Sequence, residues 1–352
     1  MSLTKSPPPE SPQAASPGTR PPRGRNAVRA AGLLVSLVLL CVLLALSVAL
    51  GAKALTLDEV WAGLTDDTSG SWTVVHDMRL PRTLLGLMVG TALGLAGGVM
   101  QALTRNPLAD PGLLGINAGA AASVVTALSF LGITGFSGYV WFAFAGAAAV
   151  AVLVYTVGGG RGATPARLAL AGAALNAALF SYVNAVMLLD TSSLDLMRFW
   201  TVGSLAGTRP EILESLGWFV VIGTVGALAL ARPLNALALG DDSARALGAR
   251  PAEVRRGAMV TVTLLCGAAT AACGPIVFVG LMVPHMVRAL TGPDLRWMLP
   301  YCAVLAPVLL LAADVAGRLL ARPSELQVGI VTAVLGGPLF LYFVTRRKVA
   351  RA

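Results

Sequence analysis

The sequence predicts an all-α polytopic membrane protein with about ten transmembrane helices. Only 12% of its residues are charged and 56% are hydrophobic, whereas a soluble domain carries about 25% charged residues. Uncharged runs also recur along the chain at about the 20-residue length needed to cross a bilayer. A soluble chain of 352 residues could not cover its surface with this composition. The lipid bilayer is therefore its first predicted partner.

Residues 1–29 contain several prolines and arginines and predict a disordered, basic tail on the cytoplasmic side. The run 30–50 that follows carries no charge. A cleaved signal peptide is the alternative interpretation, because small residues follow the run. The run is longer than the usual 7–15 residues of a signal core, so an uncleaved first span is favoured.

Apolar segments separated by short polar breaks continue to the end of a single transmembrane domain at 30–348. The weakest division is at 257–290, where Gly274 and Pro275 must separate two spans. The segments after the first are expected near 83–104, 113–132, 139–157, 168–189, 213–231, 257–273, 275–290, 298–320 and 326–345.

The distribution of positive charge predicts the orientation. With the N-terminus inside, most of the 26 Lys and Arg residues fall in inside segments, as the positive-inside rule requires. This bias supports an even number of spans, a multi-pass protein of the cell membrane and cytoplasmic termini. It also explains the net charge of +9 without a nucleic-acid partner.

Glycine recurs every four residues along the second span. On a helix this spacing makes one smooth stripe, which lets neighbouring backbones approach closely. The second span is therefore expected to be central and surrounded by other helices. The stripe consists of Gly86, Gly90, Gly94 and Gly98.

The sequence offers little to an enzyme. Four cysteines without a CxxC pair and two distant histidines predict no metal site. The glycine-rich 158–162 lacks the Lys-Ser/Thr pair of a phosphate loop, so this chain is not expected to bind ATP in that way and no cofactor is expected. An ion-coupled secondary transporter would need ionisable residues at midspan. Only Asp314 qualifies, and Arg318 lies one helical turn away as a potential partner.

Several loop motifs, taken together, resemble the permease family that imports ferric siderophores, haem and vitamin B12 through ATP-binding-cassette transporters. The resemblance covers about 30–348; departures are the Pro-rich tail and Gln327, where the family commonly has Pro. It implies ten helices per subunit, two permease subunits, cytoplasmic ATP-binding subunits and an extracytoplasmic substrate-binding protein. The motifs occur at 79–82, 106–115, 274–280, 283–288, 313–318, 329–332 and 336–338.

The segment 235–256 is the longest predicted inside loop and can form two short helices broken at Gly248. Its polar residues alternate with small and apolar ones, which suits insertion into a partner cleft; a solvated loop is the alternative. The resemblance implies docking to the ATPase. The candidate coupling residues are Asp241, Ala244, Arg245, Leu247 and Gly248.

Three arginines on the outside, Arg79, Arg82 and Arg318, either snorkel toward headgroups or bind a partner. The resemblance implies that they meet glutamates of the substrate-binding protein.

At the inner mouth, the resemblance implies cytoplasmic gates at Asn106, Leu108 and Thr164. Asn106 alternatively only caps the turn at Pro107.

The function expected from the resemblance is import of a ferric siderophore by alternating access, driven by the ATPase. Haem and corrinoid are the alternative cargoes. The second permease subunit is either identical or homologous.

Overall fold

The computed structural model describes residues 23–160, 164–207 and 210–349, and within these ranges the chain forms helices and no strand. The predicted tail 1–22 lies outside the described residues. Residues 23–29, which we expected to lack structure, already belong to the first helix. The helices are α1 Arg23–Ala49, α2 Leu57–Thr65, η1 Thr73–Arg79, α3 Leu80–Thr104, η2 Pro111–Leu114, α4 Ile116–Leu131, α5 Phe136–Val157, α6 Pro165–Leu189, α7 Thr191–Trp200, α8 Pro210–Ala229, α9 Ala231–Ala238, α10 Asp241–Ala246, α11 Pro251–Cys273, α12 Val279–Thr291, α13 Leu295–Leu320 and α14 Val328–Val349.

A helix stands at each of the expected spans, and the predicted fold class is confirmed. Among the described residues, seven helices are long and apolar enough to cross a membrane, and α4 and part of α14 are shorter apolar helices. The span expected at 275–290 differs, because Gly274 and Pro275 break the helix and α12 begins only at Val279. Its 13 residues cover about 20 Å, less than the bilayer core.

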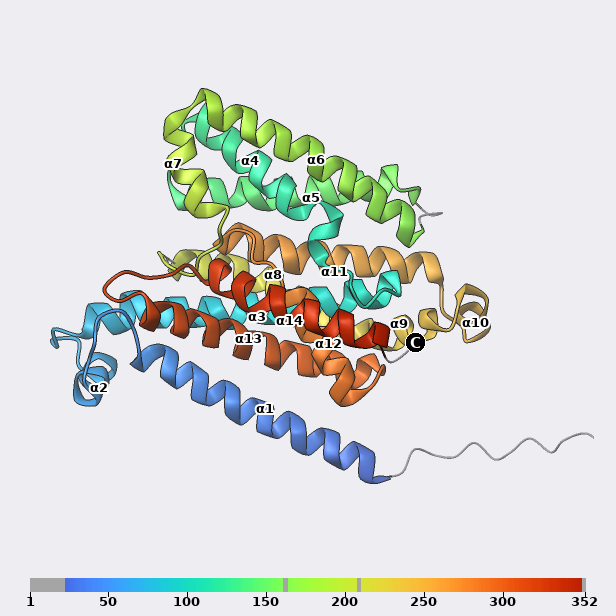
Figure 1. The fold of residues 1–352 in the computed structure, drawn as a ribbon, viewed down its shortest axis with the longest axis horizontal. Helices are drawn as coiled ribbons and strands as arrows, with labels where there is room; N and C mark the ends of the chain where they lie inside the picture. Colours follow the sequence, from blue (N-terminus) through green and yellow to red (C-terminus); the bar gives the residue numbers. More distant parts are fainter. Residues whose placement is uncertain (1–22, 161–163, 208–209, 350–352) are drawn as a thin grey trace, which may run out of the picture.

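The long helices lie roughly side by side (Figure 1). α1 begins and α14 ends at the same end of the bundle, where α9 and α10 also lie; we call this the α10 end. The opposite, α2 end carries α2 and the α13–α14 connection 321–327. Helix ends on one side are what an even number of crossings requires.

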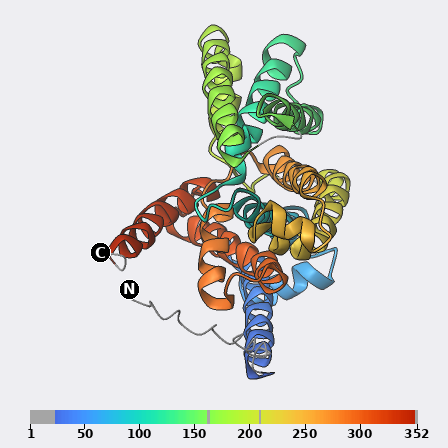
Figure 2. The same cartoon turned by 90° about the vertical axis from the view of Figure 1, so that its right-hand side faces the viewer.

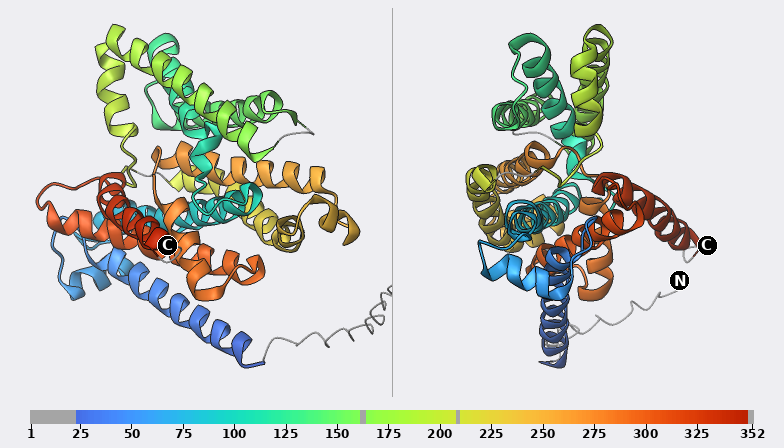
Figure 3. Two further views of the ribbon diagram at one scale, coloured as in Figure 1. Left: turned by 45° about the vertical axis from the view of Figure 1, so that its right-hand side comes forward. Right: turned by 90° about the vertical axis from the view of Figure 1, so that its left-hand side faces the viewer.

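α3 lies at the centre of the bundle, as the glycine spacing predicted. In the most apolar stretch of α3, 78% of residues are buried, against 17% in α6. α13, α11, α12 and α8 surround α3, while α1 runs along the outside and α4–α7 form a separate arm (Figure 3). α6 therefore keeps most of its apolar surface free for lipid or a partner.

All four glycines of the stripe face α13. A Cβ at Gly86 or Gly98 would press on Leu311 or Leu299, and one at Gly90 or Gly94 would overlap the α13 backbone. The stripe therefore sets how closely α3 and α13 approach. Gly97, one residue off this stripe, has the tightest contact of this helix, against the Gly280 carbonyl of α12. The four-residue glycine spacing did not predict this contact, because Gly97 lies outside the stripe.

Candidate functional site: two ends of the bundle

Arginines and acids from three distant parts of the sequence meet at the α2 end. We call this group, Arg79, Arg82, Asp314, Arg318 and Glu325, the arginine cluster. Its three arginines are between 2% and 8% exposed, and Asp314 is fully buried. η1 and the first turn of α3 present two of the arginines, and the last turns of α13 present the third with Asp314.

Asp314 is the centre of the cluster. Its carboxylate accepts from the Arg82 guanidinium at 2.8 Å and from that of Arg318, one helical turn away, at 3.0 Å. The other arm of Arg82 reaches Glu325 at 2.5 Å, and this carboxylate is 35% exposed. Charges this deeply buried persist only when they are paired and hydrogen-bonded. The partner expected for Asp314 is therefore present, together with a second arginine that was not expected.

Arg318 also holds the C-terminal end of α1. It donates to the Ser47 and Leu50 carbonyls at 3.0 and 2.9 Å. Arg79 donates to the Val48, Ala49 and Lys53 carbonyls at 2.9, 2.7 and 2.6 Å. The last carbonyls of a helix have no intrahelical partner and attract cations. These two arginines therefore fasten α1 to the bundle.

These internal contacts differ from the snorkelling interpretation of Arg79, Arg82 and Arg318, whereas docking of a binding protein at these arginines stays a prediction. Folding supplies each of them with internal partners and removes it almost entirely from solvent. Glu325 was missed because it stands in the 321–327 connection, far from Arg82 in sequence. In the sequence, the only indication of its role was that this acid stands directly before the apolar residues that begin a predicted span.

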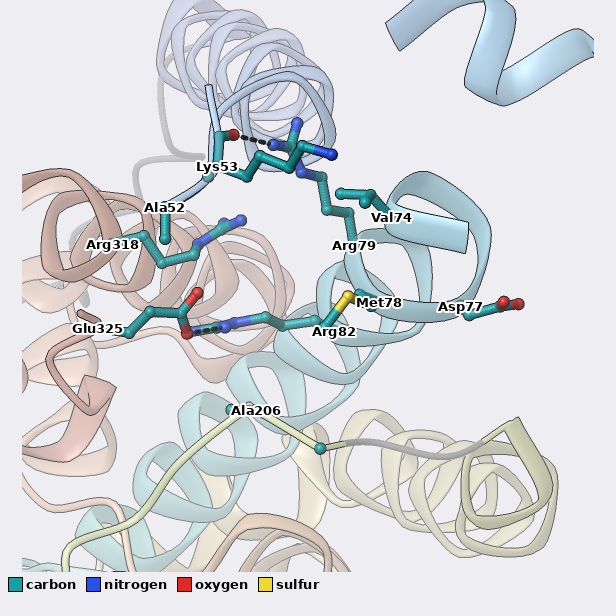
Figure 4. A pocket seen from close by; sticks show the side chains of 12 residues that line it. Ala52, Lys53, Val74, Asp77, Met78, Arg79, Arg82, Ala206, Arg318 and Glu325 are labelled. Carbon is teal, nitrogen blue, oxygen red and sulfur yellow. Dashed lines mark hydrogen bonds and ion pairs between the residues drawn. The ribbon is translucent and has the colours of Figure 1, made fainter. Parts of the chain in front are cut away.

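A pocket of about 590 Å3 opens beside the cluster. Figure 4 shows Arg82 and Glu325 pointing toward one another across it, with Arg318 above them and Lys53 beside Arg79. Asp77 belongs to the lining as well, but its carboxylate points away from the arginines. The pocket thus combines buried guanidinium groups with a carboxylate that solvent can reach.

A second cavity, of about 670 Å3, lies between the α4–α6 arm and α14. Its lining mixes amides with apolar side chains: Asn117 and Asn176 face it together with Phe180, Ile330 and Val334. Asn117 accepts a hydrogen bond from Thr270 of α11 at 3.0 Å. Asp110 also lines this cavity, and the other described residues of the lining carry no charged side chain.

At the α10 end, the predicted coupling segment 235–256 forms two short helices, α9 and α10. α9 and α10 are separated at Leu239 and Gly240, and the break predicted at Gly248 lies after α10. Gly248, with φ +81°, separates α10 from α11. The left-handed backbone conformation there favours glycine, so Gly248 positions the end of α10.

Two of the predicted coupling residues face inward. Ala244 is fully buried within the chain, so it cannot enter a partner cleft. Asp241 accepts from Arg255 of α11 at 2.9 Å and from Arg105 at 3.2 Å. Burial alone would raise the pKa of Asp241, but the hydrogen bond and charge of Arg255, with the charge of Arg105, hold it below its ordinary value. Asp241 therefore ties α10 to the bundle.

The remaining coupling residues are accessible. Leu247 is 66% exposed. Arg245 is exposed too, and among the described residues its ion-pair partner is the i−3 neighbour Asp242, at 2.8 Å. An exposed leucine beside an exposed arginine is a surface that a partner can cover. Within the segment, the side chain available for insertion is thus Leu247 and not Ala244.

The model of the FecCD transport family matches residues 38–346, nearly all of the membrane domain. The chain belongs to the FecCD transport family. This confirms the family that the loop motifs predicted.

Individual FecCD relatives carry iron-related names. The chain is 45% identical to the ferric enterobactin transport system permease protein FepD of Escherichia coli, covering 88% of this chain and 94% of FepD. It is 38% identical to the Fe(3+)-citrate import system permease protein YfmD of Bacillus subtilis, covering 92% and 97%. It is also 38% identical to the hemin transport system permease protein HmuU of Yersinia pestis, covering 90% and 96%.

A solved structure agrees with the fold of this FecCD protein. It is a proposed metal-chelate type ABC transporter in an inward-facing conformation. The TM-score is 0.79 at 27% identity, covering 90% of this chain and 99% of the other. The chain is thus a multi-pass membrane protein of a transport family.

The gate residues that the FecCD resemblance implied lie in two different connections. Asn106 follows α3, and its side chain accepts a hydrogen bond from the Leu108 N–H at 3.0 Å. This is the contact expected if Asn106 caps the turn at Pro107. Leu108 is 41% exposed. Thr164 caps α6, because its hydroxyl accepts from the Arg167 N–H at 3.4 Å. The gating role of these residues stays a prediction.

Proposed function

We propose that the chain is the permease subunit of an ATP-binding-cassette importer that carries a ferric siderophore or a related metal chelate into the cytoplasm. The observation that carries this proposal is the 45% identity to a ferric enterobactin permease over nearly the full length of both chains. A relative named for haem lies at 38%, so haem is the first competing cargo.

The proposed pathway runs along the cavity between the α4–α6 arm and α14, against a second permease subunit. Apolar residues of α6 and α14 on either side of this cavity are exposed in the single chain, among them Leu170, Leu188 and Val334. The second subunit, identical or homologous, would cover part of these faces and complete the pathway. Alternating access then requires the two subunits to open toward one side at a time.

We place the α10 end in the cytoplasm and the α2 end outside, in the cell membrane, because most of the basic residues of the connections lie at the α10 end. A separate ATPase would bind the coupling segment through Leu247 and Arg245. Its movement would act on α11 through the contact between Arg255 and Asp241.

The substrate-binding protein would dock at the α2 end. In place of free arginines, we propose an exchange of carboxylates at the pocket. An acidic side chain of the binding protein competes with the partly exposed Glu325 for Arg82, while Asp314 keeps its buried partners. Docking of this kind sets register and encounter rate more than it adds affinity.

Uptake by cells tests the proposed function. A strain that lacks this chain is supplied with labelled ferric enterobactin, ferric citrate, haem or cobalamin, with and without the gene restored. We expect restored uptake of a ferric siderophore and its loss when the ATPase is inactivated. Restored uptake of haem or cobalamin alone would reassign the cargo, and uptake that persists without ATP would exclude an ATP-binding-cassette importer.

Topology is tested separately. A reporter tag at residue 10 and one at the C-terminus should both report the cytoplasm, whereas a tag inserted near Asp66, which follows α2, should report the outside. Opposite locations for the two termini would contradict both the even number of crossings and the placement of the α10 end.

A further inference from the structure

A narrow groove of about 320 Å3 lies between α5 and α11. α5 and α11 are neighbours on the side of the bundle away from α14 (Figure 2). The groove therefore faces away from the cavity that we assign to the pathway. Its lining is Phe144, Ala148, Ala151, Val152 and Tyr155 from α5, and Arg256, Met259, Val260, Thr263 and Leu264 from α11.

The groove is apolar along its length and has a cation at one end. Val152 and Val260 on its rims are 62% and 58% exposed. Arg256 and Tyr155 lie at the α10 end, because α11 begins and α5 ends there.

The charge of Arg256 is not neutralised within the described residues. The neighbouring arginines have ion-pair partners: Arg255 binds Asp241 at 2.9 Å, and Arg250 binds Glu253 at 3.1 Å. Arg256 is exposed, and no described residue forms an ion pair with it. A cation left free at the mouth of an apolar groove suits a ligand with an anionic head and an apolar body.

The length of the groove matches one leaflet of a bilayer. From Arg256 to Leu264, α11 advances about 12 Å, and from Phe144 to Tyr155, α5 advances about 16 Å. Half of the hydrocarbon core is about 15 Å. A transmembrane helix of another protein would need a contact surface about 30 Å long to pack along its full length, which is about twice the length of the groove. A lipid chain needs only the depth of its own leaflet, with its headgroup at the position of Arg256.

We propose that this groove binds an anionic phospholipid, with an acyl chain between α5 and α11 and the phosphate against Arg256 and the Tyr155 hydroxyl. Basic pockets between transmembrane helices are known binding places for anionic headgroups. Arg256 directly follows Arg255, which holds α10 through Asp241. The bound lipid would therefore brace the start of α11 where it carries the coupling segment. The proposal rests on membrane embedding and does not depend on which chelate is carried.

Photo-crosslinking in vesicles tests the proposal. The full chain is reconstituted with phosphatidylglycerol that carries a photoreactive group on its acyl chain, and labelled residues are mapped by mass spectrometry. Labels should concentrate on 144–155 and 256–264. Unlabelled phosphatidylglycerol should compete about five-fold better than phosphatidylcholine, the factor expected from one basic side chain near an anionic headgroup.

Three variants assign the headgroup contact. Arg256→Gln should abolish the difference between the two competitors, and Arg256→Lys should retain it. Arg250→Gln is the matched control, because Arg250 lies near the start of the same helix but outside the groove, and it should behave as the parent protein. Both substituted positions, Arg250 and Arg256, are exposed, so the melting temperatures of the three variants and the parent protein should agree.

Other outcomes would overturn the proposal. Even labelling of all lipid-facing helices would mean general solvation by lipid, and equal competition by both lipids in the parent protein would remove the headgroup specificity. Disulfide cross-linking between two copies that carry Val260→Cys would show that a second chain covers the groove. Even if a variant fails to fold, competition by phosphatidylglycerol and phosphatidylcholine in the parent protein still tests whether the groove prefers an anionic headgroup.

Discussion

The two ends of the bundle use the same residue types with opposite results. At the α2 end, Arg318 and Asp314 form an i,i+4 pair whose side chains are 2% and 0% exposed. At the α10 end, Arg245 and Asp242 form an i,i+3 pair whose side chains are 63% and 99% exposed. Both pairs have nearly the same N–O distance, 3.0 and 2.8 Å. The spacing along one helix therefore predicts that a pair forms at each end, but not how much the pair contributes to the stability of the protein.

Burial explains the difference. An exposed helix pair contributes about 0.3–0.5 kcal/mol because water screens it. Removing one partner of a buried pair costs about 3–5 kcal/mol, since the remaining charge is left without compensation. The arginine cluster is thus part of the fold, whereas the exposed pairs of α10 leave its surface available to a partner.

The largest expected effect comes from the centre of the cluster. Asp314→Asn leaves Arg82 paired with Glu325 alone and leaves the buried Arg318 without an ion-pair partner among the described residues. We expect a loss of about 3–5 kcal/mol in the free energy of unfolding, measured by denaturation of the purified protein in detergent. An unchanged stability would mean that water or lipid compensates the arginines, and the contrast between the two ends would fail.

The next effect separates the buried and exposed residues of α10. Ala244→Glu places a charge in a fully buried position and should destabilise the chain by several kcal/mol. Leu247→Glu changes a residue that is 66% exposed; it should leave the melting temperature unchanged but release the ATPase.

The measurement is ATPase retention on the purified permease, together with the melting temperature of the permease alone. Ala246→Glu, at an exposed position of the same helix, is the matched control. Normal ATPase retention by the Leu247 variant would remove that residue from the coupling surface.

A smaller effect is expected at the pocket of the arginine cluster. Glu325→Gln weakens the internal competitor for Arg82, while Asp314 still pairs with Arg82 and Arg318. Binding-protein affinity should rise a few-fold, and the salt dependence of docking should become steeper because more of the Arg82 charge is available.

Asp77→Asn is the control for this variant, because Asp77 lines the same pocket but points away from the arginines (Figure 4). It removes the same formal charge from the same face. An equal gain in affinity from both variants would indicate a general effect of net charge and not an exchange at Arg82.

The smallest expected effect is at the exposed pair. Asp242→Asn breaks its contact with Arg245 and should change the free energy of unfolding by less than about 0.5 kcal/mol. Denaturation under the conditions used for Asp314→Asn makes the two ends directly comparable. A loss of several kcal/mol here would show that α10 is held more firmly than its exposure indicates.

The sequence by itself determined the helical architecture, because the length and polarity of each segment decide whether it can cross a bilayer. It also determined the close approach at α3, since four glycines in helical register share one face whatever they pack against. The pairing of Asp314 with Arg318 could likewise be predicted, because both residues lie on one helix.

Tertiary structure alone decided which charges are free. Arg82 meets Glu325 across 243 positions of sequence, and Arg318 reaches Ser47 across 271. Ala244 is covered because α10 folds back on the bundle. Within the described residues Arg256 has no ion-pair partner, because α5 across the groove offers it no acid. Spacing along one helix describes only neighbours on that helix. Burial and pairing depend on which distant elements arrive beside it, and that is set by the packing of the whole bundle.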